Sequence, residues 1–468
     1  MQRKKYVIKE IAGDTLTPIA ILQKISGEKK FLLESSNKHN DSGRFSFIGT
    51  EPVMEVIAFG DEIEVLKKNK GKVTLKGNPI EYLKKLLPKV ELNENDKIKS
   101  PFVSGAVGYI GYDIIRQFEN IGKNQFDEMQ MPDIHLMIYE EIIIFDHLDE
   151  TIQIIGTPIL EGTDTTTLEE RIDILIDEMT KTVSYEEIEQ FSFTIFKSNL
   201  TKDEFIKSVS IAKEHIVAGD IFQVVISQRM KSKYSGNSLS LYRKHRKQNP
   251  TPYMFYIDFN TYTVIGSSPE SLVKTVDKTI ITNPIAGTKK RGKTLKHDLE
   301  IETQLKNDEK ELAEHKMLVD LSRNDIGRIS NFGTVKVTKF MEVEKFRHVM
   351  HLVSEVTGEL AGDSEPLDAL SVCIPAGTVS GAPKIKAMEI INKLEKSRRG
   401  LYSGAVGYLS TNGNLDFALA IRTIVLKDRQ AYIQAGAGIV YDSDPESEYE
   451  ETINKLKSFL EDYNDFTN

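Results

Sequence analysis

The chain has 468 residues, which is enough for two or three domains or for one large domain with a broad core. Its net charge of −9, with 40% hydrophobic and 28% charged residues, is typical of a globular protein and argues against nucleic-acid binding. We expect neither a signal peptide nor a membrane span, because the basic N-terminus runs into polar residues and no apolar run approaches ~18 residues. The single cysteine, Cys373, excludes an internal disulfide and a cluster of thiolate metal ligands, so the cytoplasm is the expected compartment.

The first 160 residues are predicted to form mostly short strands, because β-branched and aliphatic runs alternate with Gly, Asn and Asp. The predicted strands cover residues 53–57, 62–66, 72–75, 136–145 and 151–155. One helix, at 79–87, interrupts them.

Apolar residues at helical spacing predict an amphipathic helix at 167–179, and we place a connecting segment at 161–199. It separates an N-terminal region, 1–160, from a C-terminal region, 200–468. In the latter we expect helices near 202–218, 308–329, 383–393 and 445–460, and strands at 222–229, at 253–257 and within 404–437.

One hexapeptide occurs twice, since Ser104–Tyr109 has the same sequence as Ser403–Tyr408. Two interpretations are open. The two segments are glycine-containing strands that each pass close to other backbone, or they are corresponding strands of a duplicated half that lie in two packed sheets.

Two pairs of glutamates occur at helical spacing. Glu311 and Glu314 are three residues apart, and Glu448 and Glu451 repeat the spacing with Lys455 one turn later. Each pair by itself fits a solvated acidic helix face. If the two pairs face each other, they offer the carboxylate oxygens that Mg²⁺ prefers.

Further candidates lie in the second half of the chain. Glycine-rich segments occur at 284–292, 375–384 and 434–438, and neither of the first two has the spacing of a P-loop. Arg422 lies in an apolar strand, where a charge needs a partner such as a substrate carboxylate. His351 fits either a core position or a catalytic one.

Taken together, these segments resemble the chorismate-utilising enzymes, and most closely the large subunits (component I) of the anthranilate synthases. The matching stretches are Ile221–Val225, Gly266–Ser271, Pro284–Gly292, Glu311–Asp325, Pro375–Lys384, Gln434–Gly438 and Glu448–Lys455. The resemblance implies an α+β fold, an α/β/β/α sandwich of two large antiparallel sheets with helices on the outside.

The resemblance also implies roles for individual residues. Glu314 and Glu451 are expected to bind Mg²⁺, with Glu311 and Glu448 in support. The proton for the leaving hydroxyl is expected from Glu270, or failing that from Glu311, and His351 is expected either to transfer a proton in the elimination of pyruvate or to position the substrate. The implied chorismate-binding residues are Gly287, Thr288, Thr378, Tyr402, Arg422, Gly436, Ala437, Gly438 and Lys455.

The implied reaction converts chorismate and ammonia to anthranilate and pyruvate. Related enzymes use a lysine as the nucleophile where this chain has Ala286, or a lysine that activates water where it has Gln223, so ammonia is expected to attack directly. A glutaminase needs a nucleophilic cysteine, which Cys373 does not resemble, so a separate glutamine amidotransferase subunit (component II) is implied, in a heterotetramer. The alternatives are an aminodeoxychorismate synthase component I and a catalytically silent regulatory relative.

Two further segments resemble the family's tryptophan-inhibition site. They are Phe31–Ser36 and Asn249–Phe255. Within them Glu34, Ser35, Pro252, Tyr253 and Met254 are the expected contacts for tryptophan. The first segment by itself also fits a strand that ends in a serine-rich turn.

Overall fold

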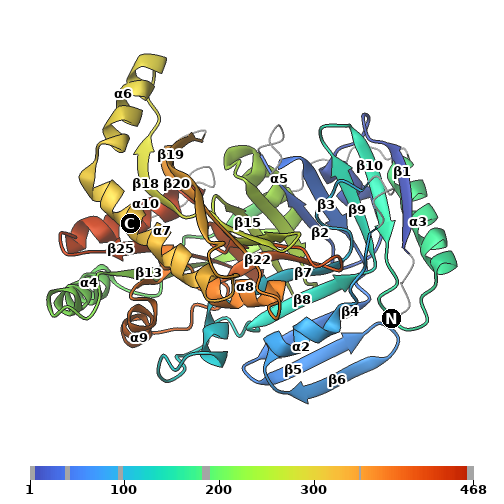
Figure 1. Ribbon diagram of the computed structural model, residues 1–468, viewed down its shortest axis with the longest axis horizontal. Coiled ribbons are helices and arrows are strands. Elements are labelled where there is room, and N and C mark those ends of the chain that lie inside the picture. Colours follow the sequence, from blue (N-terminus) through green and yellow to red (C-terminus); the bar gives the residue numbers. More distant parts are fainter. Residues whose placement is uncertain (1–5, 37–42, 93–97, 182–189, 347–348, 461–468) are drawn as a thin grey trace.

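The computed structural model describes residues 6–36, 43–92, 98–181, 190–346 and 349–460 (Figure 1). Two large antiparallel sheets pack face to face, and helices cover their outer faces. The predicted sandwich is therefore confirmed. Among the described residues, no helix is both long and apolar enough to cross a bilayer.

The first sheet has 13 strands within the described residues. Its order is β1 (Val7–Ala12), β10 (Thr151–Gly156), β9 (Glu141–Asp146), β3 (Phe45–Gly49), β2 (Phe31–Glu34), β14 (Tyr253–Asp258), β15 (Tyr262–Ser268), β24 (Thr423–Lys427), β25 (Gln430–Ile439), β13 (Gln223–Gly236) and β11 (Phe191–Phe193), with β12 (Lys197–Ser198) and β21 (Gly381–Ala382) paired to β13.

The second sheet has 12 strands within the same residues. Its order is β18 (Ile285–Lys290), β20 (Val349–Glu359), β17 (Thr279–Thr282), β16 (Ser271–Val276), β23 (Leu415–Leu419), β22 (Ala405–Ser410), β7 (Gly105–Ile110), β8 (Ile134–Tyr139), β4 (Met54–Phe59), β5 (Glu62–Lys67) and β6 (Gly71–Lys76), with β19 (Lys336–Lys345) paired to β20.

The helices form where the sequence offers both an apolar face and a cap. Thr201 accepts a hydrogen bond from the Glu204 N–H while the Glu204 carboxylate accepts one from the Thr201 N–H, which is a capping box. The helices are α1 (Pro18–Lys24), α2 (Pro79–Leu86), α3 (Thr165–Thr180), α4 (Lys202–Val217), α5 (Ser238–Gln248), α6 (Leu295–Lys306), α7 (Glu309–Gly327), α8 (Pro366–Cys373), α9 (Lys384–Leu394) and α10 (Pro445–Leu460). The structure contains a helix at each predicted position, namely α2, α3, α4, α7, α9 and α10. Of these, α3 lies in the predicted connecting segment.

Strands from both ends of the chain share each sheet. In the first sheet β2 pairs with β14, and in the second β7 pairs with β22. The regions before and after α3 are therefore hydrogen-bonded to each other within both sheets.

The single strand predicted at 136–145 is wrong, because the segment forms two strands in different sheets. β8 ends at Tyr139 and β9 begins at Glu141. Between them the fully buried Glu140 carboxylate accepts hydrogen bonds from the N–H groups of Ile159 and Leu160 and from Arg171. Buried carboxylates need such partners, so Glu140 fixes the crossing point.

The repeated hexapeptide forms β7 and β22, which are antiparallel neighbours with Gly108 opposite Gly407. The idea that the copies lie in two packed sheets is wrong. The close-approach interpretation is confirmed, since a Cβ on Gly108 would lie 2.0 Å from the carbonyl oxygen of His135, and one on Gly407 would lie 2.0 Å from that of Asp416.

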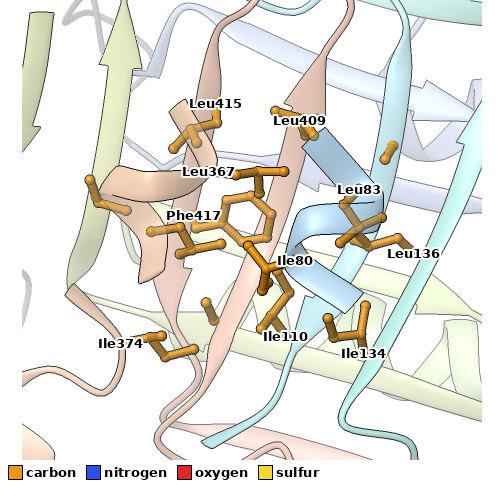
Figure 2. Packing of buried hydrophobic residues seen from close by; sticks show 14 of the residues in the cluster. Ile80, Leu83, Ile110, Ile134, Leu136, Leu367, Ile374, Leu409, Leu415 and Phe417 are labelled. Atoms are coloured by element: carbon orange, nitrogen blue, oxygen red, sulfur yellow. The ribbon is translucent and has the colours of Figure 1, made fainter. Parts of the chain in front are cut away.

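The core has three principal layers. One apolar cluster lies between the sheets, one lies beneath α1, α3, α5 and α10, and one lies beneath α2, α7 and α8. Figure 2 shows part of the last cluster, where Leu367 of α8 and Ile80 of α2 lie next to Phe417 of β23. Truncating a buried phenylalanine to alanine costs about 3–5 kcal/mol, so this layer holds the helices firmly on the sheet.

Candidate active site

A cavity of about 250 Å³ lies between the two sheets, where β13, β24 and β25 face β18 and β20. It brings together most of the predicted site residues: Glu270, Thr288, His351, Thr378, Tyr402, Arg422, Gly436, Gly438 and Lys455. Gly287 lies at its edge, while the Ala437 side chain points away and packs in the cluster of α4 and α9.

Arg422 is one of the positively charged residues that line this cavity. It precedes β24 with a positive φ of 48°, and its carbonyl accepts a hydrogen bond from the Ser267 N–H at 3.1 Å. Surrounding protein lowers the pKa of its guanidinium, yet the side chain remains accessible because it borders the cavity. Among the described residues, no side chain forms an ion pair or hydrogen bond with this guanidinium. A cation that lines a cavity and has no such partner indicates an anionic ligand.

The glycines of β25 keep the wall of the cavity open. Gly436 and Gly438 alternate with Ala437, as the period of two in a strand requires. A Cβ on Gly436 would lie 2.9 Å from the Tyr402 hydroxyl oxygen. The Lys455 ammonium of α10 donates to the Gly436 carbonyl at 2.9 Å and so fixes this helix against the strand.

Glu270 is a buried carboxyl group between β15 and β16. Thr378 donates a hydrogen bond to its Oε1 at 2.8 Å. Burial raises the pKa of Glu270 to about 7, and the Thr378 hydrogen bond only partly opposes this. Glu270 can therefore hold a proton near neutral pH and deliver it into the cavity.

A β-bulge orients His351. The register of β18 and β20 shifts between Ala286 and Thr288, and Gly287 takes a positive φ of 67°. Its carbonyl lies 3.1 Å from Nδ1 of His351. Nδ1 also lies 3.0 Å from the Thr288 hydroxyl, which can donate or accept. The carbonyl can only accept, so the arrangement that satisfies both contacts has the hydrogen on Nδ1 and a free electron pair on Nε2. Burial lowers the pKa of His351 to about 4, with the nearby charge of Arg422 adding to the effect, so the ring is neutral.

The four predicted carboxylates lie on α7 and α10, at the end of the molecule far from the N-terminal strands (Figure 1). Burial, and then the neighbouring Glu314, raise the pKa of Glu311. Burial raises the pKa of Glu448 as well, with Glu451 acting in the same direction. Glu314 accepts a hydrogen bond from the side-chain amide of Gln223 at 2.9 Å, which connects α7 to the start of β13.

These residues fit a Mg²⁺ ion in donor chemistry. Within the described ranges, no three Asp, Glu, His or Cys side chains gather as a metal-binding group. Mg²⁺ commonly takes only one or two carboxylates and completes its shell with water and substrate. Burial is the main cause of the raised pKa values of Glu311 and Glu448 and the neighbouring carboxylates add to it, and a bound cation would oppose both effects.

The predicted inhibitor segments also meet, since Glu34 of β2 pairs with Met254 of β14 and the Ser36 N–H donates to the Thr251 carbonyl. Pro252 and Tyr253 directly precede Met254 and are half-buried, and Ser35 is buried.

The sequence did not reveal the partners of Glu34. Its carboxylate accepts from Nε and Nη2 of Arg246 at 2.7 and 2.8 Å and from the Tyr242 hydroxyl at 2.5 Å. The four-residue spacing of Tyr242 and Arg246 places both on one face of α5 and was the available signal.

Residues 28–461 match the model of a protein family described as chorismate binding enzyme. The chain belongs to this family. It is 46% identical to anthranilate synthase component 1 of Lactococcus lactis over 97% of this chain and 98% of that protein. It is 43% identical to the protein of the same name from Aquifex aeolicus, over 96% of this chain and 93% of the other.

Solved structures agree with this assignment. The crystal structure of anthranilate synthase component I from Streptococcus pneumoniae superposes with a TM-score of 0.83 at 40% identity, covering 96% of this chain and 98% of that one. The menaquinone-specific isochorismate synthase of Escherichia coli, at 18% identity, shares the fold with a TM-score of 0.73 over 98% of this chain and 95% of that one.

Proposed function

We propose that this chain converts chorismate and ammonia to anthranilate and pyruvate, the first step of tryptophan biosynthesis. Relatives at 37–46% identity over nearly its full length are named anthranilate synthase component 1. The observation that carries the proposal is the unpaired Arg422 in a cavity that also holds Glu270, a buried carboxyl group with a raised pKa, and His351, a histidine with a lowered pKa. Chorismate is a dicarboxylate with a hydroxyl leaving group and fits that combination. The single, buried Cys373 agrees with the cytoplasm as the compartment.

The first half of the reaction adds ammonia at ring C2. Arg422 binds a substrate carboxylate and fixes the ring between Tyr402 and the β25 wall. Glu270 gives its proton to the C4 hydroxyl, and the C4–O bond breaks so that the hydroxyl leaves as water while the double bonds shift and ammonia attacks C2. The ammonium group formed at C2 then loses one proton to water. A Mg²⁺ ion held by Glu314 and Glu451 would supply Lewis-acid polarisation of the ring carboxylate.

The second half eliminates pyruvate. A proton leaves C2, the ring becomes aromatic, and the enolpyruvyl group takes up a proton as it departs. His351 suits the proton removal because its Nε2 carries a free electron pair at neutral pH. The Gly287 carbonyl holds the ring in this tautomer.

The identity of the nucleophile follows from two uncharged residues. Ala286 lines the cavity, and a methyl group cannot attack the ring. The Gln223 amide donates to Glu314 and cannot act as a base toward water. Both features favour ammonia as the nucleophile and disfavour the aminodeoxychorismate alternative.

The isolated chain is expected to form anthranilate from chorismate, Mg²⁺ and ammonium salt, but not when glutamine replaces the ammonium. The physical reason is that Cys373 is buried and burial raises the pKa of its thiol, so it cannot serve as a glutaminase nucleophile. Anthranilate fluorescence measures both reactions. Glutamine-dependent turnover without a second polypeptide would contradict the proposed need for an amidotransferase subunit.

Replacing Glu270 by glutamine is expected to lower kcat by about 100-fold or more, because general acid catalysis commonly contributes 10²–10⁴. The wild-type pKa of about 7 means that the protonated fraction of Glu270, and with it kcat, falls as pH rises above 7. The E270Q variant should lack this decline. The measurement is a pH–kcat profile at constant free ammonia, and an unchanged alkaline limb in the variant contradicts the assignment.

We also propose feedback inhibition by tryptophan at the junction of β2 and β14, where Ser35 lies beside Pro252, Tyr253 and Met254. A physical connection joins this junction to the active site through α5. Tyr242 and Arg246 hold Glu34, and His245 on the same helix hydrogen-bonds Ser267, whose N–H donates to the Arg422 carbonyl. A ligand that shifts α5 can thereby displace Arg422, and the coupling must be reciprocal in binding free energy.

Replacing Ser35 by arginine is expected to leave kcat nearly unchanged and to raise the tryptophan concentration for half-inhibition by about tenfold or more, because a bulky cation fills a buried position. The chain contains no tryptophan, so fluorescence of the bound ligand reports binding directly. Lys68→Arg, at an exposed surface, is the control. Unaltered inhibition of the S35R variant would place the inhibitor elsewhere.

A further inference from the structure

A second, smaller cavity lies beyond Glu270, between the outer face of the second sheet and helices α7 and α8. Glu270 and Thr378 border both this rear cavity and the substrate cavity. The rear cavity has a volume of about 30 Å³ that water-sized molecules can occupy. Since one water needs about 10–15 Å³ of such space, it has room for two.

One buried hydroxyl group in the rear cavity needs a water molecule as its hydrogen-bond partner. Thr282 of β17 is 4% exposed, and its hydroxyl has no hydrogen-bond partner among the described residues. It shares the outer face of its strand with Ile280, which packs in the cluster under α7 and α8. Buried hydroxyls in native proteins are nearly always satisfied, and here a cavity water is the available partner.

The charges that face this cavity are already balanced. The Asp325 carboxylate accepts from the Lys384 ammonium at 2.6 Å, and burial raises the pKa of the Cys373 thiol, which stays protonated. Burial raises the pKa of Asp325 and Lys384 only partly opposes this, but the ion pair still favours the carboxylate form, so water is the better proton donor to Glu270. Leu321 and Ser322 of α7 line the cavity and are half-buried, so they form its partly exposed side.

The chemistry proposed above leaves Glu270 without its proton once per turnover. The electron pair of the C4–O bond leaves with the oxygen, and the Glu270 proton completes the departing water. The carboxylate must then recover a proton in surroundings that disfavour its charge. Substrate fills the front cavity at this stage, so the rear cavity is the open side.

We propose that Glu270 is reprotonated from the rear cavity by a short water chain that Thr282 orients. The carboxylate takes a proton from the adjacent water, and the hydroxide so formed is neutralised by a proton that enters from solvent beside Ser322. No oxidant or reductant takes part, and Thr282 acts as a positioning residue. The inference rests on the proposed function, because it assigns the supply route for that reaction's acid.

Two variants test the route. Thr282→Val removes the hydroxyl at nearly constant volume, and Ser322→Leu fills the entrance. Both are expected to lower kcat by about tenfold, to leave the KM for chorismate within about twofold, and to raise the solvent deuterium isotope effect on kcat, because proton recovery becomes rate-limiting. Thr279→Val, on the same strand but outside the cavity, is the matched control and should behave as wild type.

The results of these experiments distinguish a failure of the proposed proton route from a failure of the proposed function. If wild-type protein forms no anthranilate, the proposed function fails and the route fails with it. If the wild type is active but T282V and S322L keep its isotope effect, the route alone is overturned, whatever happens to their thermal stability. A high-resolution crystal structure should show water hydrogen-bonded to Thr282, and a dry cavity would also overturn the route.

Discussion

Replacing Arg422 by methionine is expected to lower kcat/KM for chorismate by about a thousandfold without lowering the thermal stability of the protein. Losing a charge-assisted contact to a buried carboxylate costs about 2–5 kcal/mol, and each 1.36 kcal/mol is about tenfold in rate. Stability should hold because the guanidinium has no ion pair or hydrogen bond to a described residue. Removing a poorly solvated charge can even stabilise the fold.

The measurements are steady-state kinetics and thermal unfolding on the same preparations. Arg429→Met, in the turn between β24 and β25, removes an exposed arginine from the same hairpin and is the control. A large loss of stability in R422M would show that Arg422 supports the fold, and near-normal kcat/KM would remove it from the substrate site.

Replacing Glu314 or Glu451 by glutamine is expected to abolish Mg²⁺-dependent turnover, with a drop of about a thousandfold or more. A neutral amide is a much poorer ligand than a carboxylate for a hard cation. The fold should persist, because neither side chain is buried: Glu314 accepts a hydrogen bond from the Gln223 amide, and Glu451 forms a solvent-exposed ion pair with Lys455 at 2.7 Å. Calorimetric titration with Mg²⁺ in the presence of chorismate reports metal binding independently of activity.

Matched controls lie next to both residues. Glu309→Gln on α7 and Glu450→Gln on α10 make the same chemical change at exposed positions of the same helices. They should bind Mg²⁺ and turn over as wild type. Normal Mg²⁺ titrations for both E314Q and E451Q would refute the metal assignment.

Local patterns predicted the elements that depend on local chemistry. The capping box at Thr201 and the apolar stripe that follows it define α4 without reference to the rest of the chain. The spacing of Glu311 and Glu314 likewise identified a shared helix face. The prediction of a single strand at 136–145 was wrong because the segment is apolar almost throughout. Its hydrophobic pattern is the same for one buried strand as for two strands that lie in different sheets.

The sequence by itself therefore determined the residue types of the site, the positions of its helices, and the family whose sandwich fold it adopts. Only the tertiary structure decided which groups are left without a partner. The structure leaves Arg422 without a side-chain partner among the described residues, leaves the Thr282 hydroxyl in need of a water, and neutralises Glu34 with Arg246. The local sequence indicated only that Arg422 needs a partner, and it showed nothing of the other two. The reason is that hydrogen-bond satisfaction and desolvation depend on groups far apart in the chain, and folding alone brings those groups together.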